Sequence, residues 1–386
     1  MKYKLLNKGL EVELYAGTKE GEVLPLSTKI IEYLPDFSQE PDQRNFEYIT
    51  KPTRDYTELF KEIAQPRINI RNFLKRLDDN LVLIPGSTIP LAFDKSSYPS
   101  KPDEPYHKYI LNTYKTSIIT TSLHINIGIY DYENLFKLLC ALRLDTPLFL
   151  ALSASSCFHN GKLTGFHSYR WHSFPKTRAF VPFFTNHNSY INWTNEQLSL
   201  KSMQNIRHLW TSIRPNGPKR PFELNRIEIR ICDLVTDITK ALAIVSFIEC
   251  IIQKYLLEDS WPKIIRNSQS NLNEIVALIE KQEELVAKDS LDAQVWDWRN
   301  DTKKEAREII ESLYKDLTNT ADKLNVLNFL RPITDILRDG NEATQFLSIY
   351  NGTKSVQKTI QHFIEQFTIM DLKANEAIKK PTSLNL

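Results

Sequence analysis

Glycine is scarce in this sequence, with 10 residues among 386. None of them forms the GxGxxG pattern of a dinucleotide-binding fold or the GxxxxGK[ST] pattern of a P-loop. Both patterns bind phosphate groups through backbone N–H groups at the start of a helix. If the protein uses a nucleotide, metal ions and arginine side chains must therefore hold its phosphates.

Cysteine is also rare, and its four residues lie far apart without CxxC spacing. This spacing argues against a zinc site and against a disulfide framework. Because the neighbouring residues are mostly apolar, we expect buried thiols in a reducing compartment. The residues are Cys140, Cys157, Cys232 and Cys250.

No hydrophobic run is long enough to cross a bilayer. The longest, at residues 241–252, is interrupted by Ser246 and Glu249, whereas a transmembrane helix needs about 20 apolar residues. The chain also begins without the hydrophobic region of a signal peptide. We therefore expect a cytoplasmic protein that does not bind the membrane.

A charge excess is likewise missing, since the net charge is +2 and the isoelectric point is near 8.1. A protein that binds nucleic acid without regard to sequence usually has a broad cationic surface. Nucleic acid is therefore not an expected partner, and any polyanion must be bound locally.

What the sequence does contain is a repeated alternation of polar and apolar residues. In residues 9–14, Glu11 and Glu13 alternate with leucine and valine, so on a strand both carboxylates point to one face. The same alternation returns in residues 44–49, 123–127 and 227–231. These segments predict strands with one apolar face and a second face that carries carboxylates, an imidazole and an arginine.

Carboxylates on several strands favour a site for divalent cations. Mg²⁺ prefers oxygen ligands and often bridges one or two carboxylates to nucleotide phosphates. The alternative for an isolated pair is a solvated or salt-bridged side chain, but recurrence on separate strands favours the metal site. His124 alternates with Asn126 on one of these strands. A structural role is the common alternative for a lone histidine, and the neighbouring acidic strands favour a metal ligand.

Arginine is dense in three segments, around Arg170, around Arg214 and at residues 226–230. Its planar guanidinium suits bidentate binding of a carboxylate or phosphate, although a single arginine is more often part of a surface ion pair. No Ser-His-Asp or Cys-His pattern stands out, so nothing in the sequence requires a covalent protein nucleophile.

Strands and helices alternate in the first two thirds of the chain without glycine-rich crossovers, which predicts an α+β fold with an antiparallel sheet. Helices are expected at residues 56–77, 131–143 and 195–209, and an apolar helix at 239–257. From Asp237 onward the pattern is helical, with a capping box expected at residues 302–305 and a helix continuing to Pro332. We expect two parts, a catalytic domain at 1–257 and a helical extension at 258–386 that packs on or beside it. Bracing of the sheet is favoured for the extension, because its hydrophobic stripes have ordinary core width, and the alternatives are self-association or a separate partner surface.

Several motifs resemble those of one known family. Residues 209–216 (LWTSIRPN) and 225–237 (NRIEIRICDLVTD) resemble the W-x-x-x-R-P … E-x-R-x-x-D block of glutamate-cysteine ligases of the carboxylate-amine ligase type. Residues 151–156 (ALSASS) and 165–170 (GFHSYR) resemble a second block of that family. Two short phrases, PGST at 85–88 and EPDQRN at 40–45, look most like its cyanobacterial branch. The resemblance covers residues 1 to about 257.

The resemblance implies a glutamine-synthetase-like fold, in which an antiparallel sheet curves into an active-site bowl. It further implies that the protein joins the side-chain carboxylate of L-glutamate to the amine of L-cysteine through a γ-glutamyl phosphate. This reaction is the first step of glutathione biosynthesis, and it uses ATP with Mg²⁺, or alternatively Mn²⁺.

The resemblance also implies roles for individual residues. Arg230 and Glu228 would be catalytic, Arg230 and Asn126 would bind ATP, and Arg170 would bind the α-carboxylate of glutamate. Arg214 would assist in binding the substrate or phosphates. The implied metal ligands are Glu11, Glu13, Glu40, Glu47, His124 and Glu228. Position 40 has an alternative, because Asp42 lies in the same loop.

Two other functions remain open from the sequence. One is a ligase of the same fold that uses a different amine, since substrate pockets within such a scaffold differ by few contacts. The other is a metal-binding scaffold without catalysis, with the C-terminal third as a binding surface. This second alternative predicts an incomplete acidic face, whereas all the motif positions are filled.

Overall fold

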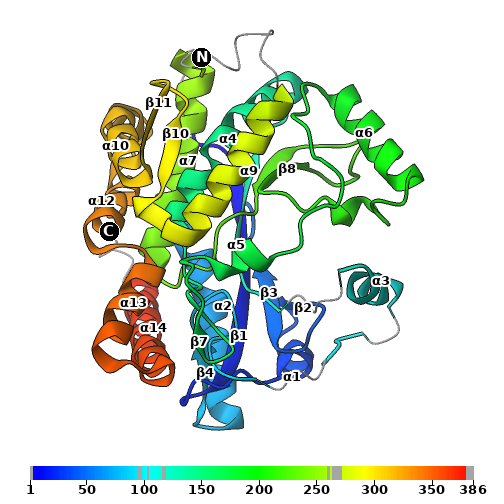
Figure 1. Cartoon of the computed structure of the whole chain (residues 1–386). Helices are drawn as coiled ribbons and strands as arrows, with labels where there is room; N and C mark the ends of the chain where they lie inside the picture. Colours follow the sequence, from blue (N-terminus) through cyan, green and yellow to red (C-terminus); the bar gives the residue numbers. More distant parts are fainter. Residues whose placement is uncertain are drawn as a thin grey trace.

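A seven-stranded sheet forms the centre of the protein, with β1 (Lys8–Thr18) as its longest strand. The strand order is β2-β3-β1-β5-β9-β8, and β4 pairs with the second half of β1. Every strand pair in this sheet is antiparallel. Figure 1 shows β1 running through the centre of the molecule. The strands predicted from alternation are β1, β3, β5 and β9, so these four predictions are confirmed.

The structure is a computed structural model that describes residues 3–93, 98–101, 104–114, 119–258, 261–262 and 272–379. The other strands of the sheet are β2 (Phe37–Gln39), β3 (Asn45–Ile49), β4 (Leu81–Ile84), β5 (Leu123–Gly128), β8 (Ile213–Asn216) and β9 (Arg226–Ile229). Two hairpins are formed by β6 (Phe158–His159) with β7 (Lys162–Leu163) and by β10 (Gln294–Asp297) with β11 (Thr302–Glu305). The helices before residue 260 are α1 (Ser27–Tyr33), α2 (Tyr56–Leu77), α3 (Pro105–Tyr114), α4 (Tyr132–Ser153), α5 (Tyr169–Ser173), α6 (His187–Ser199), the 3₁₀ helix η1 (Ile206–His208) and α7 (Ile238–Glu258). Those after it are α9 (Leu272–Asp289), η2 (Ser290–Asp292), α10 (Ala306–Lys323), α11 (Leu327–Leu330), α12 (Pro332–Asp339), α13 (Glu342–Thr353) and α14 (Val356–Lys379).

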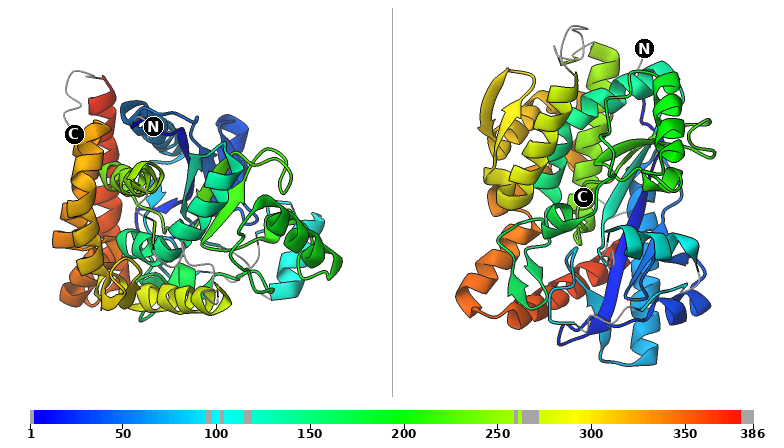
Figure 2. Two further views of the ribbon diagram at one scale, coloured as in Figure 1. Left: turned by 90° about the horizontal axis from the view of Figure 1, so that it is seen from above. Right: turned by 45° about the vertical axis from the view of Figure 1, so that its right-hand side comes forward.

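The apolar face of the sheet packs against helices α2, α4 and α7. Leu10, Val12 and Leu14 of β1 belong to one continuous hydrophobic core with these helices. Every residue of helix α7 from Ala241 to Gln253 is buried, as expected for a helix that is covered all round. Helices α10, α11 and α12 contact its outer side, and the two views of Figure 2 show this helical layer beside the sheet. The polar face of the sheet is thereby left for the site.

Two of the predicted helices begin directly after an aspartate that caps their first turn. The side chain of Asp55 accepts a hydrogen bond from Glu58 N at the start of α2, and Asp131 does the same for α4. The helix predicted at residues 56–77 is confirmed, and so is the start of the one predicted at 131. Helix α4 continues to Ser153, because the residues after Arg143 stay buried along one helix.

Three predictions about helix positions are wrong. The helix expected at residues 195–209 is α6, which begins earlier because Asn186 and Ser189 form its capping box. The expected capping box at 302–305 is instead strand β11, which pairs with β10. The following helix ends at Lys323, before Pro332, because Asn325 has the left-handed φ of 57° that terminates helices. Pro332 then occupies the first turn of α12.

The predicted α+β fold with an antiparallel sheet and a helical C-terminal region is confirmed. The division at residues 257 and 258 stays a prediction. Residues on both sides of it, such as Leu10 and Ile309, belong to the same hydrophobic core. Residues 380–386 of the extension lie outside the described residues.

All four cysteines are buried and unpaired, as expected from their spacing. Burial raises the pKa of the thiols of Cys140 and Cys232 to about 12, so these groups are poor nucleophiles at neutral pH. Within the described part of the chain, no helix has both the length and the apolar character needed to cross a bilayer.

Candidate active site

Strand register brings the predicted polar residues together on one face of the sheet. Glu11 of β1 lies opposite His124 of β5, and Glu13 lies opposite Glu47 of β3. On the next pair of strands, Asn126 lies opposite Glu228. Because side chains directly across an antiparallel pair lie about 5 Å apart, segments far apart in the sequence meet at one site.

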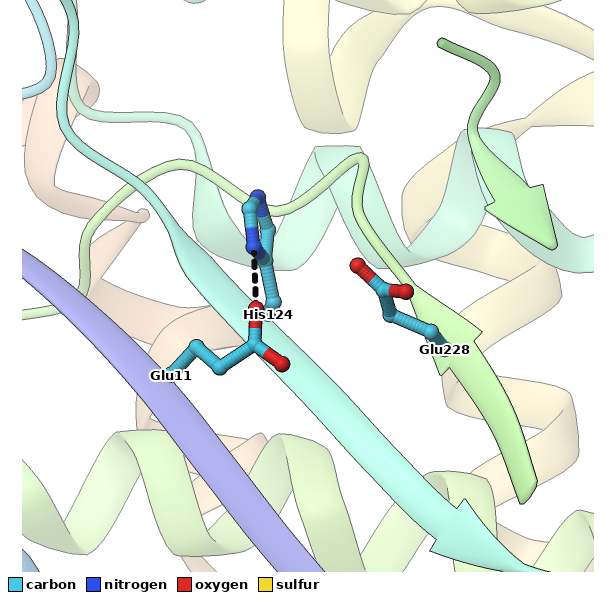
Figure 3. A group of neighbouring side chains, drawn as sticks. All are labelled: Glu11, His124 and Glu228. Atoms are coloured by element: carbon cyan, nitrogen blue, oxygen red, sulfur yellow. Dashed lines mark hydrogen bonds and ion pairs between the residues drawn. The ribbon is translucent and has the colours of Figure 1, made fainter. Parts of the chain in front are cut away.

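The first group of ligands, here called the His124 cluster, consists of Glu11, His124 and Glu228. Its three potential ligand atoms all lie within 4.8 Å of one another. His124 Nδ1 is 3.2 Å from Glu11 Oε2, and Asn126 donates a hydrogen bond of 3.1 Å to the other oxygen. Figure 3 shows the three side chains converging from three neighbouring strands.

The second group, here called the carboxylate cluster, consists of Glu13, Glu40 and Glu47, whose oxygens also lie within 4.8 Å of one another. Glu13 and Glu47 come from paired strands, whereas Glu40 directly follows β2. Three carboxylates suit Mg²⁺ or Mn²⁺, since both cations prefer oxygen ligands. The residues present therefore fit the predicted cations at two adjacent positions.

Asp42 has a different role from Glu40. Its two oxygens accept hydrogen bonds of 2.8 Å from Nε and Nη2 of Arg44, and the pair is almost fully buried. A further hydrogen bond comes from the backbone N–H of Tyr98. Asp42 thus holds its loop in place, and Glu40 is the residue that joins the carboxylate cluster.

The two clusters differ in charge state. Burial raises the pKa of Glu47 to about 8, and the negative charges of Glu11 and Glu13 add to this shift. Burial and the neighbouring carboxylates also raise the pKa of Glu40 well above its ordinary value. Burial would raise the pKa of Glu228 too, but the positive charges of Arg214 and then Arg230 hold it well below the usual range. A divalent cation would favour the deprotonated form of the carboxylate cluster.

Glu228 is fully buried and accepts hydrogen bonds from three side chains. Arg214 donates to both oxygens, from Nε at 2.7 Å and from Nη2 at 2.9 Å. Asn216 and Arg230 each donate one further bond. Arg214 therefore faces Glu228 in this structure, which places its guanidinium beside the His124 cluster.

Arg170 lies on α5 and lines a cavity beside the two clusters. Its Nη1 and Nη2 donate to the carbonyl oxygens of Ile231 and Arg230 at 3.1 and 3.0 Å. Asp233 is 3.6 Å from Nη1 and is itself held by Ser156 and Ser168. This buried network fixes the guanidinium at the edge of the site.

Two cavities adjoin the clusters. One, of about 160 Å³, is lined by the whole carboxylate cluster, by Glu11 and His124 of the His124 cluster, and by five arginines. The arginines are Arg170, Arg207, Arg214, Arg220 and Arg230. The other, of about 320 Å³, is lined by Asn126 and Arg226 and by Ile49 and Tyr130, whose side chains are largely exposed. Glu11 lies in the wall of both cavities.

Among the lining residues that the sequence did not predict are Arg207, Arg220 and Trp210. Trp210 is part of a recognised motif, but the motif indicates no role for it. The two arginines lie outside the alternating strands, one in η1 and the other in the loop that precedes β9. Their basic character is visible in the sequence, but only the fold shows that both segments reach the same cavity.

The comparisons with known proteins agree with this geometry. The family model for glutamate-cysteine ligase family 2 matches residues 7–362. The chain belongs to this family. Its glutamate-cysteine ligase resemblance is thereby confirmed, and as a member of the family the protein is a carboxylate-amine ligase.

Relatives of the family are similar along most of the chain. A protein provisionally named glutamate-cysteine ligase 2 from Solibacter usitatus is 28% identical over 77% of this chain and 76% of its own length. A protein of the same provisional name from the cyanobacterium Gloeobacter violaceus is 27% identical over 61% of this chain and 60% of its own.

Solved structures show the same fold at low identity. A glutamate-cysteine ligase from Francisella tularensis, in complex with AMP, has a TM-score of 0.71 at 13% identity, covering 100% of this chain and 95% of its own. A bifunctional glutathione synthetase from Pasteurella multocida has a TM-score of 0.73 at 15% identity. That match covers 96% of this chain but 53% of the bifunctional protein, so the chain spans about half of its length.

Proposed function

We propose that this protein joins the side-chain carboxylate of L-glutamate to the amine of L-cysteine at the expense of ATP. The observation that carries the proposal is the pair of acidic clusters beside a cavity with five arginines, in a chain that belongs to glutamate-cysteine ligase family 2. Four anionic groups, the three carboxylates of the two amino acids and a triphosphate, must be brought together for this reaction. The cavity contains the cationic groups that this requires.

Two divalent cations, Mg²⁺ or Mn²⁺, would be held by the His124 cluster and the carboxylate cluster, where they would neutralise charge on the ATP phosphates. Arg230 supports the same task, because its guanidinium lies between the clusters and interacts with Glu228 and, more weakly, with Glu11 and Glu13. Binding at such a site aligns the reacting groups and offsets the charge that develops during phosphoryl transfer.

The larger cavity supports a site for the rest of ATP. Its exposed Ile49 and Tyr130 offer apolar surface for a purine, and Arg226 offers a cation. Asn126, predicted to bind ATP, lies between this cavity and Glu11, and its oxygen accepts a hydrogen bond from Arg226. The nucleotide would thus place its phosphates at the clusters and its base away from them.

The reaction consists of two nucleophilic substitution steps. An oxygen of the glutamate side-chain carboxylate attacks the γ-phosphorus of ATP, which releases ADP and forms a γ-glutamyl phosphate. The amine of cysteine then attacks the acyl carbon, phosphate leaves, and the nitrogen loses a proton to form the amide. Arg170, held by carbonyl groups and Asp233, would bind the α-carboxylate of glutamate, and Arg214 would assist at the phosphates.

The test is a coupled assay of ADP release with glutamate and a series of amines. We expect the highest kcat/KM with cysteine, a lower value with 2-aminobutyrate, and little turnover with alanine or ammonia. A higher kcat/KM with ammonia or with another amine would show that the protein is a ligase of the same class whose amine substrate is not cysteine. No ADP release with any amine would favour a non-catalytic scaffold. Since ATP and reduced thiols are required, a cytoplasmic location is part of the proposal.

A further inference from the structure

One arginine of the smaller cavity differs from the other four in its surroundings. Arg170, Arg214 and Arg230 make hydrogen bonds to carbonyl groups or to Glu228, and Arg207 lies close enough to Glu40 to affect its pKa. Arg220 has no side-chain hydrogen bond or ion pair with any described residue, although its Nη1 is buried. An unpaired buried N–H group of a guanidinium is unfavourable unless a ligand accepts from it.

The position of Arg220 is fixed by its loop, which connects β8 and β9 at residues 217–225. Gly217 begins it, and a Cβ there would lie 2.1 Å from the backbone oxygen of Glu223, so only glycine allows the two sides of the loop to approach. Lys219 and Glu223 form an ion pair of 2.9 Å on the outside. The carbonyl of Pro221 accepts a hydrogen bond of 2.7 Å from His187 of α6. The close approach at Gly217 and the hydrogen bond from His187 hold Arg220 at the cavity wall, whereas the exposed Lys219–Glu223 pair lies on the outside of the loop.

Arg220 and Arg170 line this cavity from different elements and have different neighbours. Arg170 is beside Asp233 and interacts with Tyr15 of β1. Arg220 lies close enough to Arg214 and to Tyr190 of α6 for its charge to act on both. Two separate cationic groups on separate elements suit two separate carboxylates, one from each amino-acid substrate.

We propose that Arg220 binds the α-carboxylate of the acceptor amino acid and so restricts the acceptor to amino acids, excluding simple amines. The inference rests on the proposed ligase function and adds a specificity residue to it. The group that Arg220 binds is a carboxylate or a phosphate by chemistry, and the acceptor, glutamate and ATP are its three possible sources. The experiment separates these sources.

The first measurement uses the unsubstituted protein and compares cysteine with cysteamine, which has the same amine and thiol but lacks the carboxylate. Because a hydrogen bond to a charged group contributes about 1.5–3 kcal/mol, kcat/KM should be about 10- to 100-fold higher with cysteine. Equal values for the two amines would overturn the inference while the ligase function stands. No ADP release with either amine would remove the function and the inference together.

The second measurement uses Arg220→Ala and Arg220→Lys, with Lys219→Ala as the matched control because it removes an exposed cation from the same loop. Arg220→Ala should raise the KM for cysteine about 10-fold or more, leave the KM values for glutamate and ATP unchanged, and leave cysteamine turnover unaffected. Arg220→Lys should restore part of the cysteine affinity, and Lys219→Ala should change nothing.

Other outcomes of the second measurement would contradict the inference. A raised KM for glutamate or for ATP would assign Arg220 to that substrate instead. An equal loss with cysteine and cysteamine would show a structural role, as would a loss in both Arg220 variants without a change in the cysteine-to-cysteamine ratio. Circular dichroism of each variant verifies that the fold is kept.

Discussion

Glu228 is a charged site residue whose carboxylate is completely shielded from solvent. It is fully buried, and two arginines and an asparagine donate to its carboxylate. A buried anion is stable only when its charge and its lone pairs are satisfied in this way. Glu228 therefore serves both the fold around β9 and the electrostatics of the His124 cluster.

Glu228→Gln should lower both activity and stability. Its neutral amide leaves Arg214 and Arg230 without a counter-charge, so we expect at least about a 100-fold loss of ADP release and about 3–5 kcal/mol less free energy of unfolding. Activity and urea denaturation measure the two effects. Glu223→Gln is the control, because Glu223 pairs with Lys219 at the surface and its loss should alter neither. Wild-type turnover by the Glu228→Gln variant would disprove the catalytic assignment.

The charge state of Glu47 leads to a prediction about pH. The pKa of Glu47 is about 8 in the folded protein, because of burial and the charges of Glu11 and Glu13, and its ordinary value is 4.5. Between these values the folded state binds more protons than the unfolded state, so the stability of the metal-free protein should fall as the pH rises from about 6 to about 8. Glu47→Gln should reduce this fall in Tm.

Mg²⁺ should reverse this trend, because it binds the deprotonated cluster and displaces the proton. Below about pH 8 its affinity should rise about tenfold per pH unit for each proton released. Thermal denaturation with EDTA or Mg²⁺ at about pH 6, 7 and 8 measures the stabilisation, which should be largest at the highest pH. An Mg²⁺-induced Tm shift that is the same at all three values would show that Glu47 does not titrate in this range.

Some of the site residues could be predicted from the sequence and others could not. Glu11, Glu13 and His124 lie in alternating strands, so their common face follows from a local pattern. Glu40 follows a three-residue strand without such a pattern, and only the family resemblance indicated it. Arg220 belongs to a loop whose place depends on Gly217 and His187, contacts that no short pattern encodes.

At the scale of elements, the positions of four strands could be predicted from the sequence, but the pairing between strands could not. The alternation in β1, β3, β5 and β9 fixes which face of each strand is apolar, but it does not determine which strands pair. Strand β1 pairs with β3, β4 and β5 through contacts between distant residues. Helix ends also depended on neighbours, since residues 302–305 have a capping-box pattern and yet pair with β10.

Helices α2 and α14 are joined by a buried ion-pair group. Asp371 of α14 lies 2.5 Å from Arg67 Nη2 and also pairs with Arg71, both on α2. The ring of Phe367 packs against the two guanidinium groups. Through this group the last helix of the described chain is fixed to the helix that covers the sheet.

Asp371→Ala should destabilise the protein by about 3–5 kcal/mol, because it leaves two buried arginines without their partner. Urea denaturation gives the free energy of unfolding. Asp339→Ala is the matched control, since Asp339 pairs with Arg338 on an exposed surface of α12, and it should have little effect. Similar losses in both variants would show that the α2–α14 contact is not a specific source of stability.

At the scale of the whole molecule, one hydrophobic core joins the sheet to the C-terminal helices. Val286 of α9, Ile309 and Ile310 of α10 and Phe367 of α14 belong to the same core as Leu10 of β1. Helix α7 is covered on its outer side by α10, α11 and α12. That the extension braces the sheet stays a prediction from its hydrophobic stripes, and this shared core supports it.

A chain that ends at Glu258 should not fold on its own, because the outer side of α7 and much of α4 would be exposed. We expect it to lack a cooperative urea transition, as measured by circular dichroism. A chain that ends at Lys379 is the control and should unfold cooperatively, like the full chain. A folded, active 1–258 fragment would instead support an independent catalytic domain at 1–257.

Glu11 lines both cavities, here called chambers: the larger one, proposed to bind the nucleotide, and the smaller one, proposed to bind the amino acids. A change in the charge of this carboxylate changes the electrostatic potential in both chambers. A ligand that neutralises Glu11 from one chamber would therefore change the potential in the other. If the proposed nucleotide and amino acids bind in these two chambers, binding in one would change the affinity of the other through the charge of Glu11.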